Sequence, residues 1–400
     1  MNTERFHKDV WSRFVRMPYG HIIDYVGNNG ETVYPTPEQC ERAIPNGMGW
    51  WTPIENGAFF TGIYAYTLIK SYDASPTDRL YREIEVLIRG LYLLQDVAQC
   101  DGFIARGVAE DGVSHYPISS DDQLIPWVLA LWAYSNSSAC GNKNEVRDRM
   151  SRVLRALRHN NYAVPTDWGS VCLGSWEEHC GWRDVAKLVF VKRIIAELSG
   201  SEADMAEFRA SANGVPPASV FTRLEIISQG FANEMINSYG KQPWICASTH
   251  LALRELISLD RENERFFRLG IYNNAVTALP MIDGILDFKQ DKYKFDADWR
   301  PLIDMWEDHG TEIAPQYEMA NRQNKVWMSD IVPQRREEHV VLGNAVYAAL
   351  IAMASDDKRI VDEAYRKLIR SIEAVEWERL HLPMSYPVEC ALRFYDLLES

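Results

Sequence analysis

The sequence lacks the features that mark secreted, membrane and disulfide-rich proteins. Its seven cysteines, at positions 40, 100, 140, 172, 180, 246 and 390, are odd in number and form no C-x-x-C pair. This usage favours reduced thiols over a disulfide framework. No apolar run approaches the length of a membrane span, and the start, MNTERFHKDVWSRF, lacks the apolar centre of a signal peptide. We therefore expect a cytoplasmic protein without a membrane partner; a periplasmic location would require a leader upstream of this sequence.

Signatures of cofactor and nucleotide chemistry are also missing. No Gly-rich phosphate loop follows a strand pattern, and the G-x-S-x-G motif of serine hydrolases does not occur. His309-x-x-Glu312 offers two metal ligands, whereas a zinc site normally takes three from the protein. The net charge of −14 disfavours a nucleic-acid partner. We expect a small-molecule substrate, with no metal and no cofactor.

Aromatic side chains are abundant, with 13 Trp and 19 Tyr among 400 residues. Such rings fill cores, and they also form platforms for the flat faces of ligands. The hydrophobic content of 46% is that of a globular protein. The chain is longer than one ordinary core requires, unless the fold is a large barrel or toroid.

Two kinds of helix alternate along the chain. One-sided helices, with an apolar stripe and a charged face, are predicted at 78–99, 145–158 and 358–375. Helices that are apolar almost all round are predicted at 57–72, 122–135 and 339–354, and segments 184–198, 245–258 and 386–398 are grouped with them. A helix without a polar face must be surrounded by protein, so the second kind is inner and the first outer.

The inner helices start near 57, 121, 182, 244, 338 and 386, and the first four starts are about sixty residues apart. A repeat of that length fits one antiparallel helix pair. We therefore predict an all-α fold, an (α/α)6 toroid of six antiparallel helix hairpins in a single domain over 1–400, with a loop insertion at 283–336. The long loops precede inner helices and so gather at one end, where binding and catalytic residues usually lie.

Two stretches resemble a known superfamily. GWWTPIENGAFFTGIYAYTLIKSY at 49–72 and DGFIARGVAEDGVSHYPISSDDQLIPWVLALWAY at 101–134 are similar to the six-hairpin glycosidases, which include unsaturated glucuronyl hydrolases and related uronidases. The resemblance implies an active site at the end of the barrel where the inner helices begin. It also implies acidic side chains for general acid/base work and Trp rings that line sugar subsites.

Asp121 and Asp122 stand directly before the apolar run of an inner helix. Ser120-x-x-Gln123 reads as a capping box, and acids in a first turn suit the helix dipole. The capping box does not require two acids, however. At the mouth of a barrel, two close carboxylates would raise the pKa of one of them, which suits a general acid. We predict that at least one of the two is catalytic.

Glu55 and Glu177 are the predicted partner carboxylates, each in a long loop beside Trp residues. Glu55 could equally serve the helix N-terminus, and the loop of Glu177 could be a rim loop pinned by Trp. Arg106 could hold a substrate carboxylate through a two-pronged hydrogen bond, or bridge Glu110 or Asp111. The residues expected to bind substrate are Trp50, Trp51, Arg106, His115, Trp168, Trp176, His179, Trp244, His309, Tyr317, Arg336 and His339.

The first functional hypothesis is a glycoside hydrolase acting on an oligosaccharide, with a uronic-acid sugar as one option. The second keeps the toroid and makes the protein a polysaccharide lyase or a sugar epimerase, in which Tyr, His or Arg moves a proton beside a carbonyl or carboxylate. The third is a carbohydrate-binding protein without catalysis.

Overall fold

The computed structural model describes residues 3–172, 174–232, 242–290, 298–331 and 333–399. Within these ranges the regular elements are helices, apart from one short antiparallel pair, β1 (Val15–Arg16) and β2 (His21–Ile22), and an isolated bridge between Pro165 and Val171. The predicted all-α class is therefore confirmed.

The predicted inner helices occur close to their expected starts. They are α3 (Gly57–Ala74), α5 (Asp121–Asn136), α7 (Trp182–Ser199), α10 (Pro243–Leu259), α14 (Asn344–Met353) and α16 (Ser385–Glu399). Helix α14 continues a helical stretch formed by α13 (Pro333–Arg336) and the π-helix η7 (Glu337–Gly343), which contains the start expected near 338. None of the described helices is both long and apolar enough to cross a lipid bilayer.

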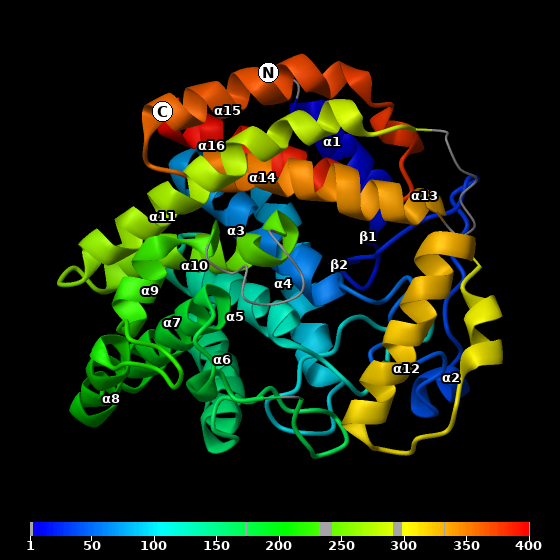
Figure 1. Cartoon of the computed structure of the whole chain (residues 1–400), viewed down its shortest axis with the longest axis horizontal. Coiled ribbons are helices and arrows are strands. Elements are labelled where there is room, and N and C mark those ends of the chain that lie inside the picture. Colours follow the sequence, from blue (N-terminus) through cyan, green and yellow to red (C-terminus); the bar gives the residue numbers. More distant parts are fainter. Residues whose placement is uncertain (1–2, 173, 233–241, 291–297, 332, 400) are drawn as a thin grey trace.

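Each inner helix has an outer partner. The contacting pairs are α3 with α4 (Asp78–Asp96), α5 with α6 (Lys143–His159), α7 with α8 (Glu202–Asn213), α10 with α11 (Glu264–Ala278), α14 with α15 (Lys358–Ser371) and α16 with α1 (Thr3–Asp9). The first five pairs are consecutive in the chain. The sixth joins the two ends of the chain, and Figure 1 shows α1 beside the orange and red helices α14 to α16.

Five of the inner helices form a closed ring of neighbour contacts. Neighbour contacts run from α16 to α3, α5, α10 and α14 and back to α16, while α7 lies against α10 and α6. This arrangement fits the predicted toroid, whose closure through α7 stays a prediction.

The segment 283–336 is predicted as a loop insertion, but its described part is largely helical. Its described part contains α12 (Ile313–Val326), the 3-10 helix η5 (Arg300–Met305) and the π-helix η6 (Trp327–Ile331). Helix α12 buries Gln316 and Gln323, and the Gln323 amide donates to Pro45 O at 2.8 Å and accepts from Asn46 at 2.8 Å. Polar residues thus occupy the buried face, so the apolar periodicity that would have identified this helix is weak. The remaining elements are η1 (Val10–Phe14), α2 (Pro37–Glu41), η2 (Trp176–Glu178), α9 (Arg223–Gln229), η4 (Leu279–Asp287), η8 (Ile372–Ala374) and η9 (Trp377–Arg379).

His7 of α1 ties the sixth pair together. Its buried ring nitrogens lie 2.9 Å from Glu389 of α16 and 2.9 Å from Glu83 of α4. Burial opposes a charge on the ring, but the hydrogen bonds to Glu389 and Glu83 outweigh burial and raise the pKa of His7 to about 9. A protonated ring can donate to both carboxylates at once.

We expect His7→Gln to lower the thermal midpoint, and the difference from the wild type to depend on pH. The folded-state pKa of about 9 lies above the usual histidine value. The stabilisation is therefore complete below about pH 6.5 and is lost as the pH rises through 9. Circular-dichroism melts from pH 6 to 10 should show the difference shrinking with pH. A constant difference would mean that the ring is not protonated.

Candidate active site

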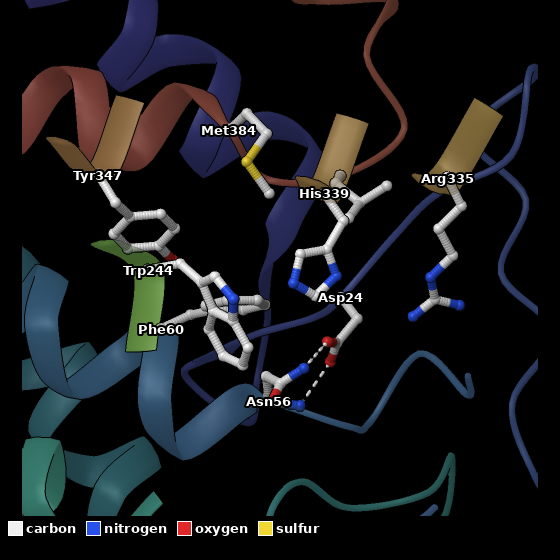
Figure 2. A pocket seen from close by; sticks show the side chains of 9 residues that line it. Asp24, Asn56, Phe60, Trp244, Arg335, His339, Tyr347 and Met384 are labelled. Carbon is white, nitrogen blue, oxygen red and sulfur yellow. Dashed lines mark hydrogen bonds between the residues drawn. The ribbon is translucent and has the colours of Figure 1, made fainter. Parts of the chain in front are cut away.

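A small pocket lies where several inner helices begin. It is lined by Asp24, Asn56, Phe60, Trp244, Arg335, His339, Tyr347, Leu382 and Met384 (Figure 2). Its empty space is about 330 Å³, including the part that opens to solvent. The enclosed part is much smaller, with about 20 Å³ of room for the centre of a water-sized molecule, so a sugar ring enters only if the lining side chains move apart.

Asp24 supplies a buried carboxyl group to this pocket. Its two oxygens accept hydrogen bonds from the backbone N–H and the side-chain amide of Asn56, both at 2.7 Å (Figure 2). The amide oxygen of Asn56 accepts from Gln123 at 3.2 Å, which orients the amide group. Burial, reinforced by the charge of Glu55, raises the pKa of Asp24 well above its usual value, although Arg335 acts in the other direction. Burial thus favours the protonated form of the Asp24 carboxyl group.

His339 and Trp244 form another wall of the pocket. Their ring centroids are 5.0 Å apart and their planes meet at 79°. Figure 2 shows the His339 ring pointing into the pocket on the side of Asp24. Burial, together with the charge of Arg335, lowers the pKa of His339 to about 4, so the imidazole is neutral at neutral pH. Its ring is free of hydrogen bonds to the residues that the structure describes.

Arg335 brings a charge that Glu55 balances. Its Nη2 lies 3.0 Å from Glu55 Oε2, and its Nη1 donates to the Trp51 carbonyl at 2.9 Å. Glu55 Oε2 also accepts the backbone N–H of Trp51 at 2.7 Å. The Arg335 Nε is buried and, among the described residues, has no hydrogen-bond partner. The predicted residues Glu55 and Trp51 therefore lie behind the pocket and hold one of its lining residues.

Sequence reasoning did not single out Asp24 or Arg335 for the site. Asp24 is the only acid in the buried run HIIDYV. Acidic side chains are rarely buried unless they are paired, so an acid inside an apolar run can mark a functional site. Arg335 lies four residues before His339, a spacing that puts two side chains on one helical face. Arg336, the predicted residue, is exposed and lies 3.8 Å from Glu337.

Arg106 is engaged by the protein itself. Its guanidinium is buried and donates to Ile118 O at 3.1 Å, Glu55 O at 3.0 Å and Ser120 Oγ at 2.7 Å. These bonds join the loop before α3 to the loop before α5. The arginine thus fixes the framework of the pocket, without the bridge to Glu110 or Asp111 that was the alternative expectation.

The capping box expected at the start of α5 is not formed. The Ser120 hydroxyl makes no cap bond and donates instead to Asp122. The Gln123 side chain turns towards α3, where it accepts the backbone N–H of Phe59 at 3.0 Å. The Gln123 side chain thus links α5 to α3, and the Ser120 side chain does not cap the helix N-terminus.

Asp121 pairs with Lys187 of α7, whose side chain is fully buried. The Lys187 amine also lies 3.8 Å from Asp184. Burial acts to raise the pKa of Asp121, but Lys187 and Arg183 outweigh burial and hold this pKa well below its usual value. The prediction was a raised pKa for one of the two neighbouring acids, and Asp121 is not that acid, because Lys187 and Arg183 lower its pKa.

Trp50 and Tyr317 meet beside the first long loop. The centroids of their rings are 6.0 Å apart and nearly perpendicular, and Trp50 packs in the same way on Trp51. These aromatic side chains come from the loop before α3 and from α12, so the insertion does reach this end of the molecule. They lie outside the set of residues that line the pocket.

The other predicted residues do not line the pocket, and most of them contact side chains of their own surroundings. Glu177 forms ion pairs with Lys192 and with Arg223, the latter at 2.9 Å. His179 lies 2.8 Å from Asp184, and Trp176 is buried.

In the neighbouring loops, His115 contacts Asp167 at 2.9 Å and His309 lies 3.3 Å from Glu307. Trp168 is half-buried against the core. The described residues contain no group of three or more His, Cys, Asp or Glu that could hold a metal ion.

Comparison with known proteins adds little to this picture. No protein-family model matches the chain, and no curated protein matches it in sequence. A crystal structure of a sugar epimerase from a ruminal bacterium aligns with 10% sequence identity over 99% of both chains, with a TM-score of 0.42. A likeness of this degree supports no conclusion about fold or activity.

Proposed function

We propose that this protein is a carbohydrate-processing enzyme that moves protons on a reducing sugar, as an epimerase or isomerase does. The observation that carries the proposal is the pairing of two groups in one pocket. His339 is a neutral imidazole without a hydrogen bond to the described residues, and Asp24 is a buried acid whose pKa is raised by burial, which favours its protonated form. A base and an acid facing one cavity can transfer protons in both directions.

The chemistry assigned to the two groups balances. The His339 imidazole takes the proton from the carbon next to the sugar carbonyl, and the electrons of the C–H bond form a C=C bond. The carbonyl electrons move to the oxygen, which takes the proton of Asp24, and an enediol results. For the isomer, His339 gives its proton to the neighbouring carbon while the Asp24 carboxylate takes the proton of the second enediol hydroxyl. For the epimer, the enediol turns over in the pocket, His339 returns its proton to the opposite face of the first carbon, and Asp24 takes back the proton that it gave to the oxygen.

The walls of the pocket carry side chains of the kinds that bind a sugar ring. Trp244 and Phe60 offer aromatic surface for the apolar face of a pyranose. The unused, buried Nε of Arg335 can donate a hydrogen bond to a sugar oxygen. The charge of Arg335 is matched by Glu55, so the site does not depend on a uronic-acid substrate.

Glycoside hydrolysis is the second candidate, and one observation favours it. The charge of Glu55 acts with burial to raise the pKa of Asp24, and two carboxyl groups that interact in this way can divide the roles of acid and base. Against it, the Glu55 carboxylate is already engaged by Arg335 and by a backbone N–H. The predicted acids Asp121 and Glu177 are also held in ion pairs.

The experiment incubates the purified protein in D2O with a panel of aldoses, ketoses and N-acetylated amino sugars. Proton NMR should show exchange of the C–H next to the carbonyl and the appearance of a second epimer or isomer. Asp24→Asn is the control variant, and it should abolish both signals. Parallel arms measure new reducing ends from glycosides and ultraviolet absorbance from uronic-acid polymers. Activity in either of these arms without C–H exchange would replace the proposal by a hydrolase or a lyase.

A further inference from the structure

Glu338 is a buried acid that the proposed chemistry does not use. It lies on η7, next to His339, and its side chain is fully enclosed. Its Oε2 accepts the backbone N–H groups of His381 at 2.9 Å and Leu382 at 2.8 Å. Its Oε1 accepts from the Gln334 amide at 3.2 Å. The carboxyl group thus takes three hydrogen bonds without lining the pocket.

These bonds connect the chain segments that supply the pocket. Leu382 lines the pocket from the segment before α16. His381 is paired with Val26, since Val26 N donates to His381 O at 3.0 Å and the His381 ring lies 3.0 Å from Val26 O. Val26 is two residues beyond Asp24. A continuous path therefore leads from the helix of His339 through Glu338 and His381 to the segment of Asp24.

We propose that Glu338 is a positioning residue, whose reach from η7 to the backbone of 381–382 sets the separation between His339 and Asp24. The inference rests on the proposed function, because these are the two groups to which proton transfer is assigned. Proton transfer needs heavy atoms within hydrogen-bond reach of the substrate, so a shift of about 1 Å at either wall lowers turnover strongly.

Two substitutions at Glu338 separate the length of the side chain from its acidity. Gln334 Oε1 is buried and has no partner in the described part of the chain, so it can accept from an amide placed at position 338 once the Gln334 side chain turns over. Glu338→Gln therefore keeps both the reach and the acceptor for the two N–H groups. Burial raises the pKa of Glu338 to about 7, so the neutral amide also resembles its protonated form. Glu338→Asp keeps the acid but draws it back by one methylene.

The test measures two quantities on each variant. The first is the pKa of the His339 imidazole, followed by NMR on histidine-labelled protein, with His339→Gln used to assign its signal. The second is kcat for the sugar reaction. We expect Glu338→Gln to keep the depressed pKa of His339 and to keep kcat within threefold. Glu338→Asp should bring the His339 pKa towards its usual value and lower kcat at least tenfold, with the thermal midpoint largely retained.

The two readouts separate the possible failures. If Glu338→Asp leaves the His339 titration unchanged, or if Glu338→Gln disturbs it equally, the positioning role is overturned. If the titrations behave as expected but the wild type turns over no sugar, the proposed function fails and the role of Glu338 in shaping the pocket stands.

Discussion

Replacing His339 by Gln should lower kcat by about 10²- to 10⁴-fold, the range that a general acid or base contributes. Glutamine fills similar space but cannot accept a proton at neutral pH. The thermal midpoint should change little, because the His339 ring makes no hydrogen bond to the described residues that the substitution would break. Initial rates in the D2O exchange assay and a melt of the same sample give both quantities.

Arg336→Gln is the matched control, since Arg336 is an exposed polar residue of the same helical stretch and does not line the pocket. The pH dependence adds a second check. The pKa of His339 is lowered to about 4, so the base form persists as the pH falls from 7 and is lost only as the pH approaches 4. A His339→Gln variant that keeps its turnover but melts early would assign His339 a structural role.

Asp121→Asn should cost stability, on the order of 3 kcal/mol, because it leaves the buried amine of Lys187 without its nearest anion. Urea unfolding of the variant and the wild type gives the difference. The pKa of Asp121 is depressed in the folded protein, so the stabilisation is complete above about pH 4 and is lost as the pH falls below that value. We therefore expect the two unfolding curves to converge in acid.

The double variant Asp121→Asn/Lys187→Met should recover much of the lost stability, since no unpaired charge then remains at this position. Turnover of Asp121→Asn on any active sugar should stay within a few-fold of the wild type. Loss of turnover at an unchanged urea midpoint would instead restore the catalytic role that the sequence suggested for Asp121.

The helices could be predicted because their signal is local. Segment 57–72 is apolar on every side, and it is the inner helix α3; segment 78–99 has one apolar stripe, and it contains the outer helix α4. The exception is α12, whose buried face carries Gln316 and Gln323. A glutamine in the core satisfies its amide through tertiary hydrogen bonds, and no periodicity of apolar residues reports such bonds.

The candidate site could be predicted only in outline. Trp244 and His339 were among the expected residues and line the same pocket, but Asp24 and Arg335 were not named. Asp24 lies in the long connection before α3, but a single acid between apolar residues forms no motif that would mark it.

The helical class and the places where the inner helices begin follow from the amino-acid sequence, because the spacing of apolar residues along a segment shows whether it is buried on one face or on all faces. Which acids are ion-paired, and which have a raised pKa, depends on contacts that form only in the folded chain. Asp121 meets a lysine 66 positions away, and Glu55 meets an arginine 280 positions away. The pKa of a carboxyl group is set by burial and by such distant partners, and neither can be read from its neighbours in the chain.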